Sequence, residues 1–373
     1  MEEKIRYFSN SERVSAVCRE IYSGYGYRQY KMSRFEEYDL YAANRDFLID
    51  DSIITFTGSD GKLMALKPDV TLSIVKNAAA TGRDQEKVFY LENVYRKPKS
   101  NSDFKEIMQL GLECIGDIGL YQMGEVISLA AQSLSVIDEN YILDISHMGI
   151  ISALADLAGI YGAAREGLIK FINGKNAAGV RAVCDECGAE AGLAERLVRL
   201  TGVYGPFKTA MPQLRALSVN EATDAALDEI RGIYEILEVT GCAGRVNLDF
   251  SHTGDMNYYN GVTFCGYIEG IPSAVLSGGR YDRLLRKFGK PGGAIGFAIY
   301  LDLLDLLPQP KREYDVDVLL VCGEHDGVSV ARAVQRLRLE GKSVLAVSRV
   351  PENGITWREA VKIEGIMPED KTS

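Results

Sequence analysis

The chain has 373 residues, of which 46% are hydrophobic and 25% are charged, and its formal net charge is −10. This composition is typical of a soluble protein with two or three packed units, and the acidic balance argues against general attraction to a nucleic-acid backbone. No run of about 18 apolar residues occurs, and the N-terminus has no apolar signal-peptide core. We therefore expect a cytoplasmic protein that binds neither membranes nor nucleic acid.

The seven cysteines are scattered along the chain, and Cys184 and Cys187 form their single close pair. A structural zinc site needs about four thiolate or imidazole ligands, but no second pair and no histidine lies near these two residues in the sequence. Buried thiols on a helix, in a reducing compartment, explain the pair better. The sequence therefore predicts neither a metal nor a cofactor.

The N-terminal region predicts one helix and then a β-hairpin. A cap-like segment at residues 9–11 precedes apolar residues at helical spacing, and Gly24 ends the run. Two strand-like runs, 53–57 and 63–66, then flank a turn-rich joint that contains two glycines.

Two further strands are expected at 88–92 and 107–115, with a polar loop between them. Alternation along the second strand sends its apolar residues to one face and Gln109, Gly111 and Glu113 to the other. At about 3.4 Å per residue, the amide and the carboxylate lie roughly 13 Å apart along the strand. Taken alone, these two polar residues would fit a solvated sheet face as well as a binding site.

Helical periodicity then dominates residues 118–240, and strand character returns at 246–250 and 262–268. Strands separated by a block of helices predict an α+β fold, in which an antiparallel sheet has flanking helices and a helical insertion at about 151–240.

The C-terminal part of the sequence has a different pattern. After Pro308 and Pro310, an apolar strand at 316–321, a helical stripe and a second strand at 343–347 predict a βαβ unit. We therefore predict two domains, 1–310 and 311–373, of which the second is a truncated α/β unit with one further helix at 357–363.

Four stretches, taken together and in this order, resemble the histidyl-tRNA synthetases, which are class II aminoacyl-tRNA synthetases. Leu66-Lys67-Pro68-Asp69-Val70-Thr71 is similar to the Leu-Arg-Pro-Glu-Gly-Thr element of that family. Residues 94–96 and 104–116 resemble the histidine-specific form of motif 2. Residues 257–264 resemble the tyrosine-rich histidine element, and residues 277–284 with 296–299 resemble the Gly-Gly-Arg-Tyr-Asp element and the start of motif 3.

The resemblance implies a class II synthetase-like fold and a histidine-binding site. Within that site, Asp69 and Thr71 correspond to residues that hold the amino group, which is chemically reasonable because an ammonium needs acceptor oxygens. Arg96 corresponds to an arginine that contacts the α-phosphate or the carboxylate. The implied histidine-binding set is Asp69, Thr71, Arg96, Gln109, Glu113, Tyr258, Tyr259 and Tyr281.

Two departures from the synthetase pattern affect the ATP side of the site. Gly254 stands where the family has its catalytic arginine, and Leu303 stands where motif 3 has its ATP-binding arginine. Adenylate formation concentrates negative charge, and loss of one such electrostatic donor typically costs about 100- to 1000-fold in rate. The sequence therefore predicts that the chain does not activate an amino acid.

Retained histidine-side residues, altered ATP-side residues and a short C-terminal unit together resemble the regulatory subunits of ATP phosphoribosyltransferase, which are paralogues of the synthetases. That resemblance implies a noncatalytic dimer that joins the short-form catalytic subunit in a hetero-octamer and mediates histidine feedback at the first step of histidine biosynthesis. Two alternatives remain, a stand-alone histidine-binding sensor and an active histidyl-tRNA synthetase. Gly254, Leu303 and the acidic charge disfavour the second of these.

Overall fold

The computed structural model describes residues 8–48, 53–78, 85–97, 103–251, 258–309, 313–352 and 354–366. The chain divides into two compact units, a larger one over Phe8–Leu307 and a smaller one that contains Pro308–Ser373. Within the described ranges, no helix has the length and apolar character needed to cross a membrane.

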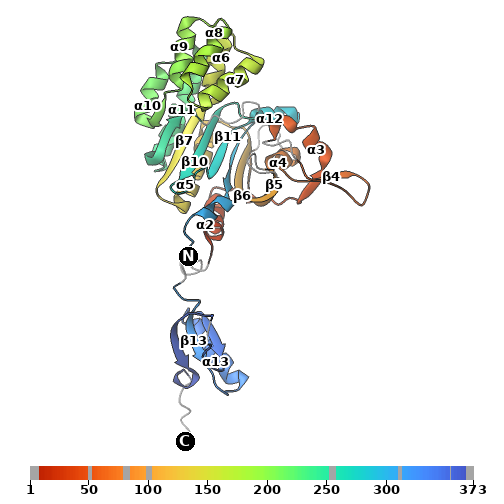
Figure 1. Cartoon of the computed structure of the whole chain (residues 1–373), viewed down its shortest axis with the longest axis vertical. Helices are drawn as coiled ribbons and strands as arrows, with labels where there is room; N and C mark the ends of the chain where they lie inside the picture. Colours follow the sequence, from red (N-terminus) through yellow and green to blue (C-terminus); the bar gives the residue numbers. More distant parts are fainter. Residues whose placement is uncertain are drawn as a thin grey trace. The chain divides into compact units, whose positions relative to one another are not determined.

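The larger unit is built on a nine-stranded sheet, several strands of which are labelled in Figure 1. Neighbouring strands are antiparallel except in two parallel pairs, so the predicted α+β fold with a largely antiparallel sheet is confirmed. The strand order is β1 (Arg28–Gln29), β5 (Glu86–Arg96), β6 (Lys105–Gly116), β12 (Gly293–Tyr300), β11 (Leu276–Arg280), β10 (Val262–Ile268), β7 (Tyr141–His147), β9 (Val246–Asp249) and β8 (Tyr204–Pro206).

Two helices cover one face of this sheet. Helix α2 (Asn10–Gly24) begins at the predicted cap, where the Ser9 side chain accepts from the Glu12 backbone and the Glu12 side chain accepts from the Ser9 backbone. Helix α5 (Leu120–Ile137) packs so closely on β10 that a Cβ at Gly266 would meet the Leu134 side chain at 2.6 Å. Because side chains alternate along a strand, the neighbours of Gly266 point to the opposite face.

The helical insertion is more interrupted than the sequence indicated. It contains α6 (Met148–Leu157), α7 (Gly162–Asn173), α8 (Ala177–Glu186), α9 (Ala191–Leu200), α10 (Phe207–Arg215) and α11 (Glu221–Val239). Two strands, β7 and β8, lie within residues 118–240, where helical periodicity predicts helices, and this part of the prediction is wrong. Both are short sheet members whose pairing partners are distant in sequence, which helical periodicity does not register.

The cysteine pair lies in this insertion, with Cys184 buried in α8 and Cys187 at its C-terminal cap. Across the described residues, no group of three or more histidine, cysteine, aspartate or glutamate side chains has the geometry to hold a metal ion.

A small three-stranded sheet lies beside the main sheet in the order β2 (Phe35–Glu37), β4 (Leu63–Leu66) and β3 (Thr55–Thr57). The antiparallel pairing of β3 with β4 confirms the predicted hairpin. Three short helices border this sheet, namely α3 (Tyr38–Ala42), η1 (Arg45–Phe47) and α4 (Thr71–Asn77). The larger unit also contains η2 (Ala243–Arg245), α12 (Asp282–Lys287) and η3 (Leu301–Leu306).

The smaller unit contains the expected βαβ arrangement, formed by β13 (Val316–Val321), α13 (Gly327–Leu339) and the parallel strand β14 (Val344–Val347). The helix expected at 357–363 is wrong. Residues Trp357–Lys362 form strand β15, which pairs parallel with β13, and η4 (Ile363–Gly365) follows. Pairing along the free edge of β13 satisfies the β15 backbone and overrides local helical propensity.

Candidate functional site

A cavity of about 310 Å³ lies on the sheet face opposite α5. Its floor is set by strand register, because Glu113, Gly296, Gly279 and Thr263 are successive neighbours across β6, β12, β11 and β10. The adjacent row contains Gly111, Ala298, Ser277 and Cys265. Small residues in both rows leave room above the sheet, and this room forms the cavity.

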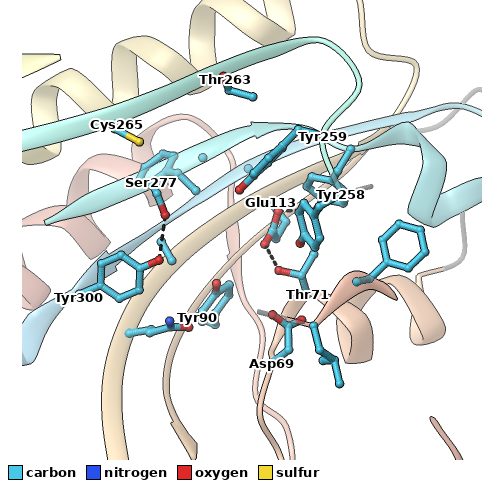
Figure 2. Close-up of a pocket in the computed structure, with 18 of the residues that line it drawn as sticks. Asp69, Thr71, Tyr90, Glu113, Tyr258, Tyr259, Thr263, Cys265, Ser277 and Tyr300 are labelled. Carbon is cyan, nitrogen blue, oxygen red and sulfur yellow. Dashed lines mark hydrogen bonds between the residues drawn. The ribbon is translucent and has the colours of Figure 1, made fainter. Parts of the chain in front are cut away.

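The structure brings all eight residues of the predicted histidine-binding set to the lining of this one cavity. Figure 2 shows Asp69, Thr71, Glu113, Tyr258 and Tyr259 grouped around it. The residues come from five separate segments of the chain, namely the approach to α4, strands β5 and β6, the residues before β10, and the end of β11. The sheet is what brings these segments together.

Glu113 is the most buried acid of the cavity, with 2% of its surface exposed. Its Oε1 accepts a hydrogen bond of 2.8 Å from the Thr71 hydroxyl, drawn in Figure 2, and its Oε2 accepts one from the Tyr281 hydroxyl. Burial raises the pKa of Glu113 to about 8, although both hydroxyl donors act in the opposite direction. A ligand that supplies a positive charge or a further donor would stabilise the ionised form.

Asp69 is the second buried carboxylate. Its Oδ1 accepts from the Leu72 backbone N–H at 2.8 Å, in the first turn of α4, and its Oδ2 lies 3.4 Å from the Arg96 guanidinium. Burial raises the pKa of Asp69, and Arg96 partly offsets that effect. Arg96 also donates from Nε to the Pro68 carbonyl at 2.6 Å, so two acceptors hold it in place.

The cavity is therefore acidic. Among the described residues that line it, Arg96 is the one that carries a positive charge, whereas Asp69 and Glu113 each place a carboxyl group there whose ionised form a cationic ligand would favour. A buried site with this balance favours a ligand that has at least one cationic group and one anionic group, since Arg96 is available for an anion.

Four aromatic rings form one wall of the cavity. The ring of Tyr258 lies 4.7 Å from that of Tyr259, 5.6 Å from that of Tyr281 and 6.1 Å from that of Phe47, measured between centroids. These spacings are those of offset or edge-to-face aromatic pairs, which pack a planar ligand group on one side.

The other end of the cavity is neutral and hydroxyl-rich. The Ser277 and Tyr300 hydroxyls are 2.8 Å apart, as Figure 2 shows, and the Thr263 hydroxyl is 2.6 Å from that of Ser146. Burial raises the pKa of the Cys265 thiol to about 12, so this residue stays neutral too. No described residue at this end supplies a cation for a polyphosphate.

The two departures from the synthetase pattern fall in different places. Leu303 lies in η3 and packs against the main hydrophobic core. It does not line the cavity, whose lining ends at Tyr300 in that part of the chain. Gly254 lies outside the described residues.

Three large lining residues lie outside the motifs that predicted the site, and the sequence did not predict them. They are Phe47, Tyr90 and Tyr300. Strand alternation offered a signal for Tyr90, since it directly faces Gly111 across β5 and β6, and a Cβ at Gly111 would lie 2.1 Å from the Tyr90 ring. Phe47 had no such signal, because η1 meets the cavity through tertiary packing alone.

A sequence model described as Histidyl-tRNA synthetase matches residues 6–304, so the chain belongs to the histidyl-tRNA synthetase family. Within that family, the chain belongs with the ATP phosphoribosyltransferase regulatory subunits. It is 30% identical to the one from Clostridium kluyveri over 297 residues, which covers 78% of this chain and 76% of the relative. It is 27% identical over 336 residues to the one from Acetivibrio thermocellus, with 87% and 80% covered.

Solved structures show the same fold. A Bacillus halodurans protein titled as an ATP phosphoribosyltransferase regulatory subunit/histidyl-tRNA synthetase superposes with a TM-score of 0.79 at 26% identity, covering 95% of this chain and 93% of that one. A chain of the ATP phosphoribosyl transferase HisG:HisZ complex from Thermotoga maritima superposes with a TM-score of 0.61 at 18% identity, covering 78% of this chain and 97% of that one.

Proposed function

We propose that this chain is a noncatalytic, histidine-binding regulatory subunit of ATP phosphoribosyltransferase, the enzyme of the first step of histidine biosynthesis, and that it acts in the cytoplasm. The observation that carries the proposal is the charge pattern of the cavity, in which two buried carboxylates and an aromatic wall accompany one arginine. The names of its relatives in the regulatory-subunit family support the same role.

Free histidine matches this pattern group by group. Its ammonium fits Asp69, Thr71 and Gln109, because each offers an acceptor oxygen to a cationic donor. Its carboxylate fits Arg96.

The imidazole fits beside Glu113, Tyr258, Tyr259 and Tyr281, where a buried carboxylate accepts a ring N–H and the aromatic rings pack on the planar group.

Amino-acid activation is disfavoured by the same pattern. An aminoacyl-adenylate reaction needs preorganised cations around the α-phosphate and the leaving pyrophosphate. Arg96 is the single cation among the described lining residues, and the carboxylate of histidine is already assigned to it, so no further cation remains for a polyphosphate there. Leu303 contributes apolar packing where a synthetase places an arginine.

Regulation would require histidine to bind one arrangement of the enzyme complex better than another, because a ligand with equal affinity for both shifts neither. The partner we propose is the short-form catalytic subunit, with this chain as a dimer inside a hetero-octamer. The fold shared with a chain of the Thermotoga maritima complex is consistent with that partnership.

The test is the activity of the cognate short catalytic subunit, measured with and without this chain and then with histidine added. Activity that depends on the chain, and that histidine inhibits, is the expected result. Gln109→Ala and Glu113→Ala should weaken the inhibition, whereas Gln213→Ala, an exposed change on α10, should leave it unaltered.

Two outcomes would contradict the proposal. Absence of both complex formation and activation would favour a stand-alone histidine sensor. A histidine-dependent exchange between ATP and pyrophosphate would instead favour an active synthetase.

A further inference from the structure

Phe47 lines the cavity but comes from outside the nine-stranded sheet. It is the last residue of η1, and 7% of its surface is exposed. Its ring meets the Tyr258 ring at an interplanar angle of 60°, so it extends the aromatic wall formed by the three tyrosines. Unlike those tyrosines, Phe47 has no hydroxyl group, and it can offer a ligand only apolar contact and exclusion of water.

Helix α12 contacts this segment through one side chain. Lys287, the last residue of α12, places its Nζ 5.0 Å from the centroid of the Phe47 ring and 3.6 Å from Oδ2 of Asp46. One side chain therefore contacts two consecutive residues of η1. A cation over an aromatic face and an ion pair are each modest interactions at a partly exposed site, and together they favour a single placement of the ring.

The same helix begins directly after a residue that hydrogen-bonds the central acid. α12 starts at Asp282, and the preceding Tyr281 donates to Glu113. The elements that orient the Glu113 carboxylate and the Phe47 ring are thus consecutive in the chain. Tyr281 and Lys287, at the two ends of this short helix, therefore contact Glu113 and Phe47 respectively.

We propose that Phe47 contacts the bound amino acid and determines how tightly it is held, and that Lys287 is a positioning residue that keeps Phe47 against the cavity. The inference rests on the proposed function, because it concerns how the same cavity retains histidine. An apolar ring beside Asp69 and Glu113 keeps water away from their contacts with the ligand, and charge-assisted hydrogen bonds are stronger where water is excluded.

The inference predicts a specific kinetic effect. Truncation of Phe47 to alanine should raise the dissociation constant for histidine about tenfold, mainly through faster release, because changes within one binding site act chiefly on dissociation. Phe47→Leu keeps part of the apolar contact and should raise it only about threefold. Lys287→Ala should also raise it about threefold, and Lys287→Arg should restore it.

The experiment is equilibrium dialysis of the full-length chain against labelled histidine, with the release rate measured after dilution into unlabelled histidine. Two matched controls remove similar groups elsewhere. Phe56→Ala deletes an exposed ring of the small sheet, and Arg286→Ala deletes an exposed cation from the same helix as Lys287. The melting temperature of every variant shows whether it is folded. If Phe47→Ala does not fold, Phe47→Leu provides the test of the Phe47 contact.

Faster release from the Phe47 and Lys287 variants, with unaltered controls, would support the inference. Wild-type affinity and release in both Phe47→Leu and Lys287→Ala would overturn it and leave the proposed function standing. Failure of the wild-type chain to bind histidine would overturn both together.

Discussion

Glu113 and Gly296 are direct partners across β6 and β12, and the Glu113 carboxylate occupies the space that a side chain at position 296 would need. A Cβ placed on Gly296 would lie 1.8 Å from Oε2 of Glu113. Glycine at position 296 therefore leaves the space in which the Glu113 carboxylate lies on the sheet, between the Thr71 and Tyr281 hydroxyl donors. Three of the predictions below concern this arrangement, and a fourth concerns a buried ion pair between β5 and α5, on the opposite face of the sheet.

Gly296→Ala should displace the Glu113 carboxylate and weaken histidine binding. A methyl group inserted at a filled position typically costs about 1–3 kcal/mol of unfolding free energy, and here the displaced group is also a binding group. Urea unfolding and histidine titration measure the two effects. Gly167→Ala is the control, since nothing lies within 4 Å of a Cβ at this position in α7, and alanine should be neutral or stabilising there. Unchanged affinity in Gly296→Ala would contradict the role given to the glycine.

Glu113→Gln should change how stability depends on pH. Burial raises the pKa of Glu113 from 4.5 to about 8, so between these values the folded state binds more protons than the unfolded state. The associated stability is fully present below about pH 4.5 and is lost as the pH rises through about 8.

The wild-type chain should therefore lose at least about 1 kcal/mol of unfolding free energy between pH 6 and pH 8 relative to Glu113→Gln. Denaturant unfolding at a series of pH values measures the difference. Asp69 is present in both proteins, and because its charge raises the pKa of Glu113, the comparison reports on the coupled pair of carboxyl groups. Parallel pH profiles would show that Glu113 titrates as an exposed acid does.

Tyr281→Phe should raise the pKa of Glu113 further, because it removes a hydroxyl donor that favours the ionised carboxylate. Loss of one partner of a buried charged group also costs about 1–3 kcal/mol of stability. A carbon-13 NMR titration of labelled glutamate follows the pKa directly. Tyr300→Phe is the control, since its hydroxyl pairs with Ser277, and it should leave the Glu113 titration in place. A shift of equal size in both variants would contradict this assignment.

Lys87→Met should destabilise the protein by about 3 kcal/mol, because it leaves the Glu125 carboxylate buried without its cation. Lys87 Nζ lies 2.6 Å from Glu125 Oε1, and 4% of the Glu125 surface is exposed. The Tyr27 hydroxyl, which donates to the same oxygen at 3.1 Å, is neutral and does not replace the lost charge. Lys62→Met breaks an exposed pair with Glu37 and should leave the unfolding free energy almost unchanged. Equal costs by urea unfolding would contradict the importance of burial.

The sequence by itself determined the features that depend on local periodicity and capping. Alternation in β6 fixed Gln109 and Glu113 on one face, because a strand has a side-chain period of two whatever surrounds it. The Ser9 cap and the helical spacing after it located α2 for the same kind of reason. Motif order then brought eight residues into one predicted site, and the structure places all eight around one cavity.

Tertiary structure alone decided the rest. Strand β15 and the strands inside the helical stretch exist because distant backbones pair with them, and local sequence does not specify a distant partner. Phe47 reaches the cavity through packing against Tyr258 and Lys287, which follow it in the chain by more than 200 residues. The raised pKa of Glu113 likewise depends on burial, which arises only when the sheet, its helices and the aromatic wall close around the carboxylate.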